Sequence, residues 1–360
     1  MAIESPYIKI AKELAERICC GVYRGSLPSI SRLSTEFKVC DATIKRTMSQ
    51  LRDWDLVDGQ QGKCVLINPK ALGNPFFRRR IVVFAPMAKV YNPFYGSILD
   101  HLNTSISSVY ACFNLFVSLE QLKECGFRPD LLIAVDILPS SSLLQELSGY
   151  VIPERLILLN QMHSRYHYIS TDNFRAGYAA IAYLAETCGH RHIGFLASQL
   201  QYSEACLKKR HDGALQYASE HPELVLTSVE IPDKGIADEY LPWVEKLYQL
   251  DPEISAIFGS TDLIAVSVYA YATKYKLNIP EDLAVLGFDN QRYSRTLYPP
   301  LSTFSEKSDE MGRHLFELAK QLLICKSPAI PQSRMIILPE LLIRQSTGRE
   351  NIPPTKPECT

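Results

Sequence analysis

The chain has 360 residues, which is long for one compact domain and predicts two or three folding units. Its composition, 46% hydrophobic and 21% charged, is that of a globular protein, and no apolar run is long enough to span a bilayer. The first residues lack the basic start and apolar middle of a secretory signal, so we expect a cytoplasmic protein. The ten cysteines have no CxxC or zinc-ligand spacing, which favours reduced packing residues over disulfides.

The net charge of −1 is unevenly distributed along the chain. Residues 1–70 hold eleven Lys or Arg against eight Asp or Glu, a net charge of +3, whereas the remainder holds 27 against 31. In this mildly basic unit, apolar residues recur at helical spacing in residues 6–22, in LPSISRLSTEF with Ser29 as its cap, and in DATIKRTMSQLRDW. The segment DGQQGKCVLI then predicts two short strands around a turn at Gly62. Three short helices and a hairpin predict a winged helix-turn-helix.

This first unit resembles the GntR family of winged-helix proteins over residues 5–67, in the pieces SPYIKI, LPSISRLS, VCDATIKRTM and QQGKCV. The resemblance implies binding to duplex DNA, with the third helix in the major groove and the wing on the adjacent groove or backbone. The residues that it nominates as DNA contacts are Ser31, Arg32, Thr43, Lys45, Arg46, Gln61, Gly62 and Lys63. Three positions depart from the family: Ser31 replaces a DNA-contacting arginine, and Cys40 and Asp41 replace Ser or Thr and then Arg. A solvated helix face is the alternative for this polar surface.

The second unit follows a linker at residues 71–80 and alternates strand and helix signals. It is organised around residues 169–196, which predict a strand end, a helix capped by Thr171, Asp172 or Asn173, a stop at Gly189 and a buried strand. The strand-like runs are IVVFAP, FNLFV, LLIAV, LILLN, IGFL, VLTSVEI, AIFG and AVLGF. This alternation predicts an α/β fold with doubly wound parallel sheets.

The same unit resembles the effector-binding domain of the LacI/GalR regulators and their relatives, the periplasmic sugar-binding proteins. The matching pieces are NPFYGSIL, the TDN-x-x-x-G motif from Thr171, GHRHIGFL, the arginine of KKRHDGAL, STD, LGFDN and PPLSTF. The resemblance implies a two-lobed, periplasmic-binding-protein-like domain over residues 81–346, with the chain recrossing between lobes near Ser302 and Ser333. Lobe one is expected at about 81–170 and 303–332, lobe two at about 171–302 and 333–346, and a tail at 347–360.

The resemblance also places an effector between the lobes. The contacts that it nominates are Phe94, Tyr95, Asn160, Arg210, Thr261 and Asp289. A polyol needs bidentate partners for vicinal hydroxyls, which Arg210 and Asp289 supply, and a flat apolar surface, which Phe94 or Tyr95 supplies. The alternatives are an ion pair or a helix cap for the charged residues and core packing for the aromatic ones. Asp172 and Asp262 each precede a helix, so we expect them as N-caps.

Motifs of catalysis and metal binding are missing from the sequence. It contains no phosphate loop, GxSxG, HExxH, or GxGxxG after a strand, so we do not expect an enzyme. His190 and His192, and His163 and His167, lack Cys or carboxylate partners at ligand spacing. Solvated or hydrogen-bonded histidines are therefore expected, with no metal or cofactor.

Together these features predict a ligand-responsive transcriptional regulator, a repressor in which a sugar-like effector changes lobe closure and the spacing of two DNA-binding units in a homodimer. The order of the two modules resembles that of the arabinose repressors of Bacillus. A purine effector is the alternative, because one branch of the LacI family senses nucleobases. Lys234, standing where relatives place a stacking aromatic, would suit an acidic group on the effector. A cytoplasmic solute-binding protein without DNA binding is a further alternative, which leaves residues 1–70 without a purpose.

Overall fold

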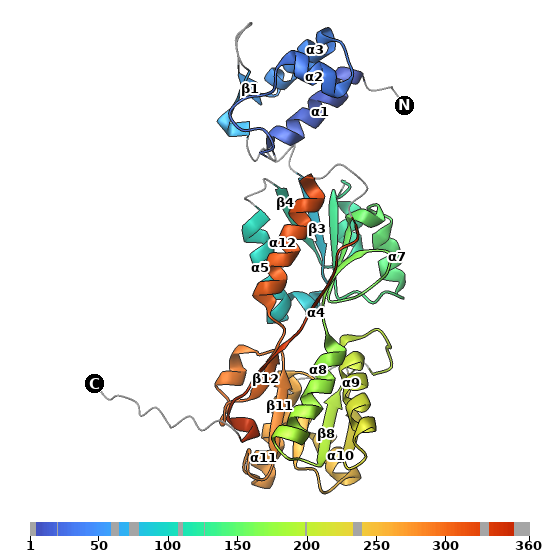
Figure 1. The fold of residues 1–360 in the computed structure, drawn as a ribbon, viewed down its shortest axis with the longest axis vertical. Helices are drawn as coiled ribbons and strands as arrows, with labels where there is room; N and C mark the ends of the chain where they lie inside the picture. The colour runs from blue at the N-terminus through green and yellow to red at the C-terminus, as the bar shows by residue number, and fades with distance from the viewer. Residues whose placement is uncertain are drawn as a thin grey trace, which may run out of the picture.

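The computed structural model describes residues 5–19, 21–58, 65–71, 79–106, 111–125, 127–198, 200–232, 240–324 and 331–348. The molecule is elongated, with a small helical unit at one end and two α/β lobes following it along the long axis (Figure 1). Within these ranges, no helix is both long and apolar enough to cross a membrane. The predicted fold class, α/β with parallel sheets in two lobes and a separate N-terminal unit, is confirmed.

The N-terminal unit contains α1 (Pro6–Cys19), α2 (Ile30–Phe37), α3 (Asp41–Asp53) and the antiparallel strands β1 (Val57–Asp58) and β2 (Leu66–Ile67). Its core consists of the predicted apolar helix faces, including Leu14, Leu33 and Ile44. Ser29 caps α2, since its hydroxyl accepts a hydrogen bond from the backbone N–H of Arg32. The wing turn predicted at Gly62 lies outside the described residues, but the strands that flank it pair as expected.

The first lobe is a parallel sheet in the order β13-β7-β6-β5-β3-β4. Its strands are β3 (Arg79–Phe84), β4 (Ala111–Phe116), β5 (Leu131–Val135), β6 (Leu156–Leu159), β7 (His167–Thr171) and β13 (Arg334–Ile337). One face packs against α5 (Pro93–Ile106) and α12 (Ser308–Ile324), and the other against α6 (Leu119–Glu124) and α7 (Ser142–Ser148). Burial of both faces explains why the strands are continuous apolar runs.

The second lobe repeats this design in the order β14-β12-β11-β10-β8-β9, with only β14 antiparallel among these pairs. Its strands are β8 (His192–Ala197), β9 (Val225–Glu230), β10 (Ala256–Gly259), β11 (Ala284–Phe288), β12 (Ser302–Ser305) and β14 (Glu340–Leu342). One face packs against α8 (Asn173–Ala182) and α9 (Cys206–Glu220), the other against α10 (Leu241–Leu250) and α11 (Asp262–Tyr275). In the central stretch, Asp172 caps α8 as predicted, and the helix continues into a π-helical turn over Tyr183–Thr187. Gly189, with a φ of 84°, comes after that turn.

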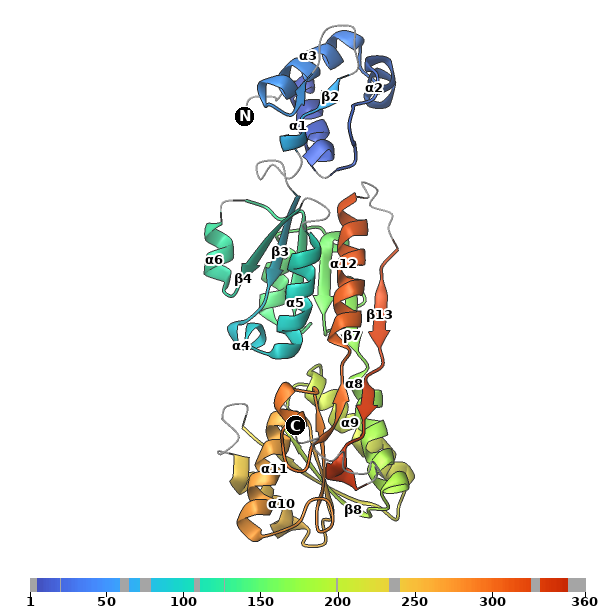
Figure 2. The ribbon, with the colours of Figure 1, turned by 90° about the vertical axis from the view of Figure 1, so that its left-hand side faces the viewer.

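The chain passes between the lobes three times, and two of the predicted crossing points are wrong. β12 pairs with β11 in the second lobe, so the chain returns to the first lobe after Ser305 rather than near Ser302. β13 pairs with β7 in the first lobe, so the last crossing follows Ile337 rather than Ser333. These two crossings run next to each other between the lobes (Figure 2). Short apolar strands look alike in either sheet, so only the pairing decides where the chain crosses.

The linker predicted for residues 71–80 is shorter than expected, because Arg79 and Arg80 already belong to β3. Arg79 forms ion pairs with Glu16 of α1 at 3.0 Å and with Asp130 of the first lobe at 3.2 Å. The guanidinium of Arg80 lies 4.5 Å from the centre of the Phe127 ring. These two arginines are thus held by protein groups instead of lying in a solvated linker.

The tail predicted from residue 347 also begins later. Thr347 is buried in the second lobe, where its hydroxyl lies 2.8 Å from the hydroxyls of Tyr183 and Ser302. The neighbouring Ser346 is buried as well and donates a hydrogen bond to the carbonyl of Val285. The segment up to Thr347 is therefore part of the lobe, and residues 349–360 lie outside the described ranges.

Candidate functional site

The predicted DNA-contacting surface belongs to α2 and α3. The structure describes Ser31, Arg32, Thr43, Lys45 and Arg46 of this set, and Gln61, Gly62 and Lys63 lie outside the described residues. Lys45 and Arg46 are exposed on α3 and form no ion pair with any residue that the structure describes. Thr43 is partly buried, with its hydroxyl 3.3 Å from the Cys40 sulfur. The unit therefore presents two available cations on one turn of the predicted recognition helix.

Asp41, which departs from the family pattern, has a local structural role. The Ser34 hydroxyl donates a hydrogen bond of 2.5 Å to the Asp41 carboxylate, which ties α2 to the first turn of α3. A carboxylate in the first turn also interacts favourably with the helix dipole. Asp41 thus helps to fix the two helices relative to each other.

In the two lobes, three polar residues with positive φ follow directly after buried strands. They are Asp136 after β5, Asn160 after β6 and Asp289 after β11, with φ of 50°, 61° and 110°. The backbone N–H of each donates to a carbonyl of an adjacent strand or strand end, so the chain turns sharply at the sheet edge. Such backbone conformations are rare outside glycine and least unfavourable for Asn and Asp. The carboxyl ends of parallel strands are where open α/β sheets bind ligands.

A cavity of about 330 Å³, here called the cleft, lies between these strand ends. All six residues predicted to contact an effector line it: Phe94, Tyr95, Asn160, Arg210, Thr261 and Asp289. Other lining residues, which the sequence did not nominate, include Lys89, Asn92, Asp136, Gln161, Cys206 and Glu306. The volume lies within the range of small-molecule sites, roughly 300–1,000 Å³.

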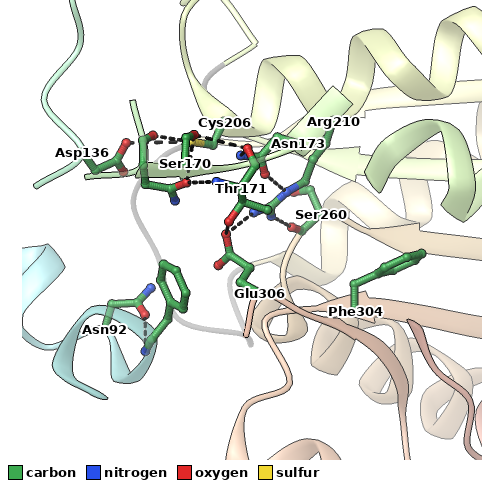
Figure 3. A network of polar contacts seen from close by, with 12 residues as sticks. Asn92, Asp136, Ser170, Thr171, Asn173, Cys206, Arg210, Ser260, Phe304 and Glu306 are labelled. Atoms are coloured by element: carbon green, nitrogen blue, oxygen red, sulfur yellow. Dashed lines mark hydrogen bonds and ion pairs between the residues drawn. The ribbon is translucent and has the colours of Figure 1, made fainter. Parts of the chain in front are cut away.

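Arg210, on α9, is buried at 3% exposure and is held by protein groups. Its Nε donates to the side-chain oxygen of Asn173 at 2.7 Å, and Nη1 donates to the carbonyl of Ser260 at 2.6 Å. Nη2 lies 3.6 Å from the Glu306 carboxylate (Figure 3). The guanidinium carbon lies 3.3 Å from the centre of the Phe288 ring. The guanidinium is therefore fixed in place before any ligand arrives.

Two glycines bring the backbone of Arg210 to this position. A Cβ on Gly177 of α8 would lie 1.7 Å from the carbonyl oxygen of Arg210, and a Cβ on Gly213 of α9 would lie 1.9 Å from that of Phe174. The helices α8 and α9 therefore cross with their backbones in contact. The last residue of the TDN-x-x-x-G motif is needed because no side chain fits there.

Glu306, in the crossing between β12 and α12, was missed by the sequence prediction. It is 4% exposed, accepts a hydrogen bond of 2.9 Å from the Thr171 hydroxyl and faces Arg210 (Figure 3). Because Thr171 precedes the first crossing, this bond joins two of the three connections between the lobes. Burial raises the pKa of Glu306, and the nearby Arg210 opposes that increase. In the sequence, Glu306 stands in the polar run SEKSDE, which is typical of a surface segment.

Asn160 organises the first-lobe wall of the cleft. Its side-chain nitrogen donates to the Tyr95 hydroxyl at 2.9 Å, and its side-chain oxygen accepts from the backbone N–H of Thr171 at 3.2 Å. Burial raises the pKa of Tyr95 well above its usual range, so this hydroxyl stays protonated. Tyr95 and Phe94 belong to the core of the first lobe, so they line the cleft while most of their surface packs in the protein.

Asp262 differs from its predicted role as a helix cap, and Thr261 takes that position. Thr261, nominated as an effector contact, lines the cleft and is also the N-cap of α11, where its hydroxyl accepts a backbone N–H at 3.3 Å. Asp262, predicted as the cap, is fully buried and accepts from the N–H of Gln291 at 2.7 Å and the hydroxyl of Thr303 at 2.6 Å. Burial raises the pKa of Asp262 to about 6. Asp262 thus anchors the loop that follows Asp289.

A second ion pair lies on the first-lobe side of the cleft. Nζ of Lys89, on α4 (Met87–Val90), lies 2.6 Å from the Asp136 carboxylate, which also accepts from the side-chain nitrogen of Gln161 at 2.8 Å. The Cys206 sulfur, from the second lobe, lies 3.3 Å from the carbonyl oxygen of Asn160. Burial raises the pKa of Cys206, so its thiol stays protonated.

The histidine pairs form hydrogen bonds within the protein, as expected. His190 Nδ1 lies 2.8 Å from the Ser255 hydroxyl, and His192 Nδ1 lies 2.9 Å from the Asp251 carboxylate. His167 accepts from the backbone N–H of Ser333, and His163 from that of Arg165. No group of three possible metal ligands occurs among the residues that the structure describes.

Sequence comparison connects the C-terminal part of the chain, which contains most of the second lobe together with α12 and β13 of the first, to known proteins. The pattern of the periplasmic binding protein-like domain matches residues 181–347. The HTH-type transcriptional repressor PurR of Haemophilus influenzae is 29% identical over 184 residues, which cover 49% of this chain and 52% of the repressor. The chain thus spans about half the length of the curated relatives that it matches.

Solved structures extend the likeness to both lobes. A LacI family transcriptional regulator from Silicibacter pomeroyi superposes with a TM-score of 0.65 at 20% identity, covering 75% of this chain and all of that one. The transcriptional regulator CelR, solved in complex with cellobiose, gives a TM-score of 0.64 at 18% identity and covers 89% of this chain and all of its own. At these identities the comparison establishes the fold.

Proposed function

We propose that the chain is a ligand-responsive, DNA-binding transcriptional regulator, a repressor controlled by a small effector in the cleft. The observation that carries the proposal is the presence, in one chain, of a helix-turn-helix unit with exposed Lys45 and Arg46 and of a two-lobed cleft lined by buried charges. The sequence similarity to the repressor PurR and the fold of a LacI family regulator support it. This role needs no catalysis, and it places the protein in the cytoplasm with its DNA.

The N-terminal unit is assigned to the GntR type of winged helix because its three helices and two paired strands follow the order of that motif. Its combination with a LacI-type sensor is the arrangement of the arabinose repressors of Bacillus. A sugar is the favoured effector, because the cleft combines aromatic rings with paired polar groups, and CelR, which shares the fold, holds a sugar. A purine is the second candidate.

In this proposal the effector acts by changing the relative population of open and closed lobes. The chain crosses between the lobes three times, and Glu306, in the second crossing, lines the cleft and bonds to Thr171 at the start of the first. Closure would move the first lobe, which contacts the DNA-binding unit through Arg79 and Glu16. We propose a homodimer, because one recognition helix spans too few base pairs for a selective site.

The test of DNA binding is a double variant, Lys45→Ala with Arg46→Ala, titrated against a duplex selected by the full chain from a random library. If both side chains neutralise phosphates, the slope of log affinity against log salt falls by about 0.9 for each phosphate that is no longer neutralised. The control is Lys123→Ala with Lys320→Ala, which removes the same charge from exposed positions on the first lobe. Binding weakened equally by both double variants would contradict the assignment of α3.

Two further measurements separate the alternatives. Light scattering of the full chain alone and with the selected duplex tests the dimer, and a monomer in both states contradicts it. Failure to select any duplex, together with binding of a sugar in the cleft, would favour a solute-binding protein without DNA binding.

A further inference from the structure

The cleft holds more carboxylates than cations. Among the described residues that line it, the charged side chains are those of Lys89, Arg210, Asp136, Asp289 and Glu306. If all five are ionised, one negative charge is in excess. An uncompensated charge in a largely buried site is unfavourable, so a proton or a ligand has to balance it.

Both cations are already engaged by the protein. Lys89 lies 2.6 Å from Asp136, and Arg210 directs two of its nitrogens to neutral protein oxygens and the third towards Glu306. An anionic group on a ligand would have to displace one of these carboxylates and leave it unpaired. Breaking a buried ion pair in this way is strongly unfavourable.

The groups left without a partner are hydrogen-bond acceptors on opposite walls of the cleft. The Asp289 carboxylate, at the end of β11 in the second lobe, forms no hydrogen bond or ion pair with any described residue. Gln161, beyond β6 in the first lobe, is fully buried, and its Oε1 accepts no hydrogen bond within the described part of the chain. That oxygen has almost no accessible surface, so Asp289 is the acceptor that a ligand in the cleft meets.

On the basis of the proposed function, we propose that the effector carries an ammonium group, as in an amino sugar or an amine-bearing polyol of hexose size. The ammonium binds the Asp289 carboxylate at the end of β11. An ammonium supplies three donors and the missing positive charge, whereas a sugar hydroxyl supplies one donor and no charge. The direction of the Asp289 pKa agrees with this assignment. Burial raises it well above the usual range despite Arg210, which is the direction expected for a buried carboxylate that lacks a cationic partner.

Calorimetry of the full chain with ligands that differ only in one charged group tests the proposal. Each set shares a ring: glucosamine, glucose and glucuronate; galactosamine, galactose and galacturonate; mannosamine, mannose and mannuronate. We expect at least one amine to bind about tenfold tighter than its neutral counterpart, with the acid weakest, since a charged hydrogen bond is worth more than a neutral one. Asp289→Asn should remove the preference for the amine. Asp100→Asn, which removes the same charge from an exposed position on α5, should retain it.

Three results would overturn the proposal: an acid or neutral sugar that binds as tightly as its amine, no binding by any of the amines, or an equal effect of Asp289→Asn on amine and neutral ligand. Duplex binding by the same samples distinguishes this failure from failure of the proposed function. If the chain binds its selected duplex but shows no amine preference, the effector class is wrong and the regulator proposal stands. If it prefers amines but selects no duplex, the effector class stands and the regulator proposal is wrong.

Discussion

Replacement of Arg210 with methionine removes the cation that joins the second lobe to the crossing segment. Methionine retains an aliphatic stem over Phe288 but leaves the side-chain oxygen of Asn173, the carbonyl of Ser260 and the Glu306 carboxylate without their donor. Breaking a buried ion pair costs roughly 3–5 kcal/mol, and each unsatisfied acceptor adds about 1–3 kcal/mol before relaxation. The ion pair and the two neutral acceptors together give roughly 5–11 kcal/mol, and relaxation of the neighbouring groups recovers part of this loss. We therefore expect the unfolding free energy of the second lobe to fall by roughly 3–6 kcal/mol at neutral pH.

Glu306 determines how much of this loss is electrostatic. In the variant Arg210→Met, Glu306 is still buried, but the positive charge that lowers its pKa is gone. The pKa of Glu306 therefore rises further above the ordinary value of 4.5. The native state then binds the proton of Glu306 more tightly than the unfolded state does. The loss of unfolding free energy is therefore largest above the raised pKa, and it becomes smaller as the pH falls towards 4.5. Adding Glu306→Gln removes the unpaired carboxylate and keeps an acceptor for Thr171. The double variant should therefore be more stable than Arg210→Met alone at neutral pH.

The chain has two tryptophans, which makes this measurement specific to one lobe. Trp54 lies at the end of α3 in the N-terminal unit, and Trp243 lies on α10 in the second lobe. In a Trp54→Phe background, tryptophan fluorescence during urea unfolding follows the second lobe. The reasoning is refuted if the effects of Arg210→Met and Glu306→Gln add to within about 0.5 kcal/mol and do not change with pH.

Two further predictions concern the positioning of the same lobe and of the DNA-binding unit. Gly177→Ala forces α8 away from the backbone of Arg210 and should lower both the melting temperature and effector affinity. Gly96→Ala in α5, whose Cβ would meet nothing closer than 3.9 Å, should leave both unchanged in scanning calorimetry and titration. Arg79→Ala removes the ion pairs that join α1 to the first lobe, so amide exchange in α1 should become faster. Arg24→Ala, at an exposed arginine of the same unit, should leave the exchange unaltered.

Much of the fold was predictable because its determinants are local. Helix faces repeat every three to four residues, and strands buried on both faces form short apolar runs. The TDN-x-x-x-G motif places a cap and a glycine at fixed offsets, and the structure gives each a physical cause in Asp172 and Gly177. Asn160 and Asp289 were nominated through the family resemblance, and both also show a local signal, a polar residue directly after a buried strand. Applied consistently, that signal also finds Asp136 after LLIAV.

The features that were predicted wrongly or missed depend on interactions between distant segments. The crossing points were predicted a few residues too early. They depend on the pairing of β12 with β11 and of β13 with β7, and the sequence of a single strand does not show with which strand it pairs. Lys89 pairs with Asp136 in the cleft, and Glu306 bonds to Thr171, 135 residues earlier in the chain. The N-cap of α11 is Thr261 and not the predicted Asp262, because the helix starts one residue earlier than expected. A difference of one residue is within the usual uncertainty of a helix boundary.

Glu306 belongs both to the lining of the cleft and to a connection between the lobes, and in the proposed function this arrangement couples ligand binding to closure. Glu306 lies in one crossing, bonds to Thr171 at the start of another and faces Arg210 in the cleft (Figure 3). The backbone of Asp289 donates to the carbonyl of Phe304, two residues before Glu306. A ligand that neutralises Asp289 therefore alters the charge balance around Arg210 and Glu306, at the point where the chain passes between the lobes. Because those groups are buried, the change is not screened by solvent, and it acts directly on the segments that must bend when the lobes close.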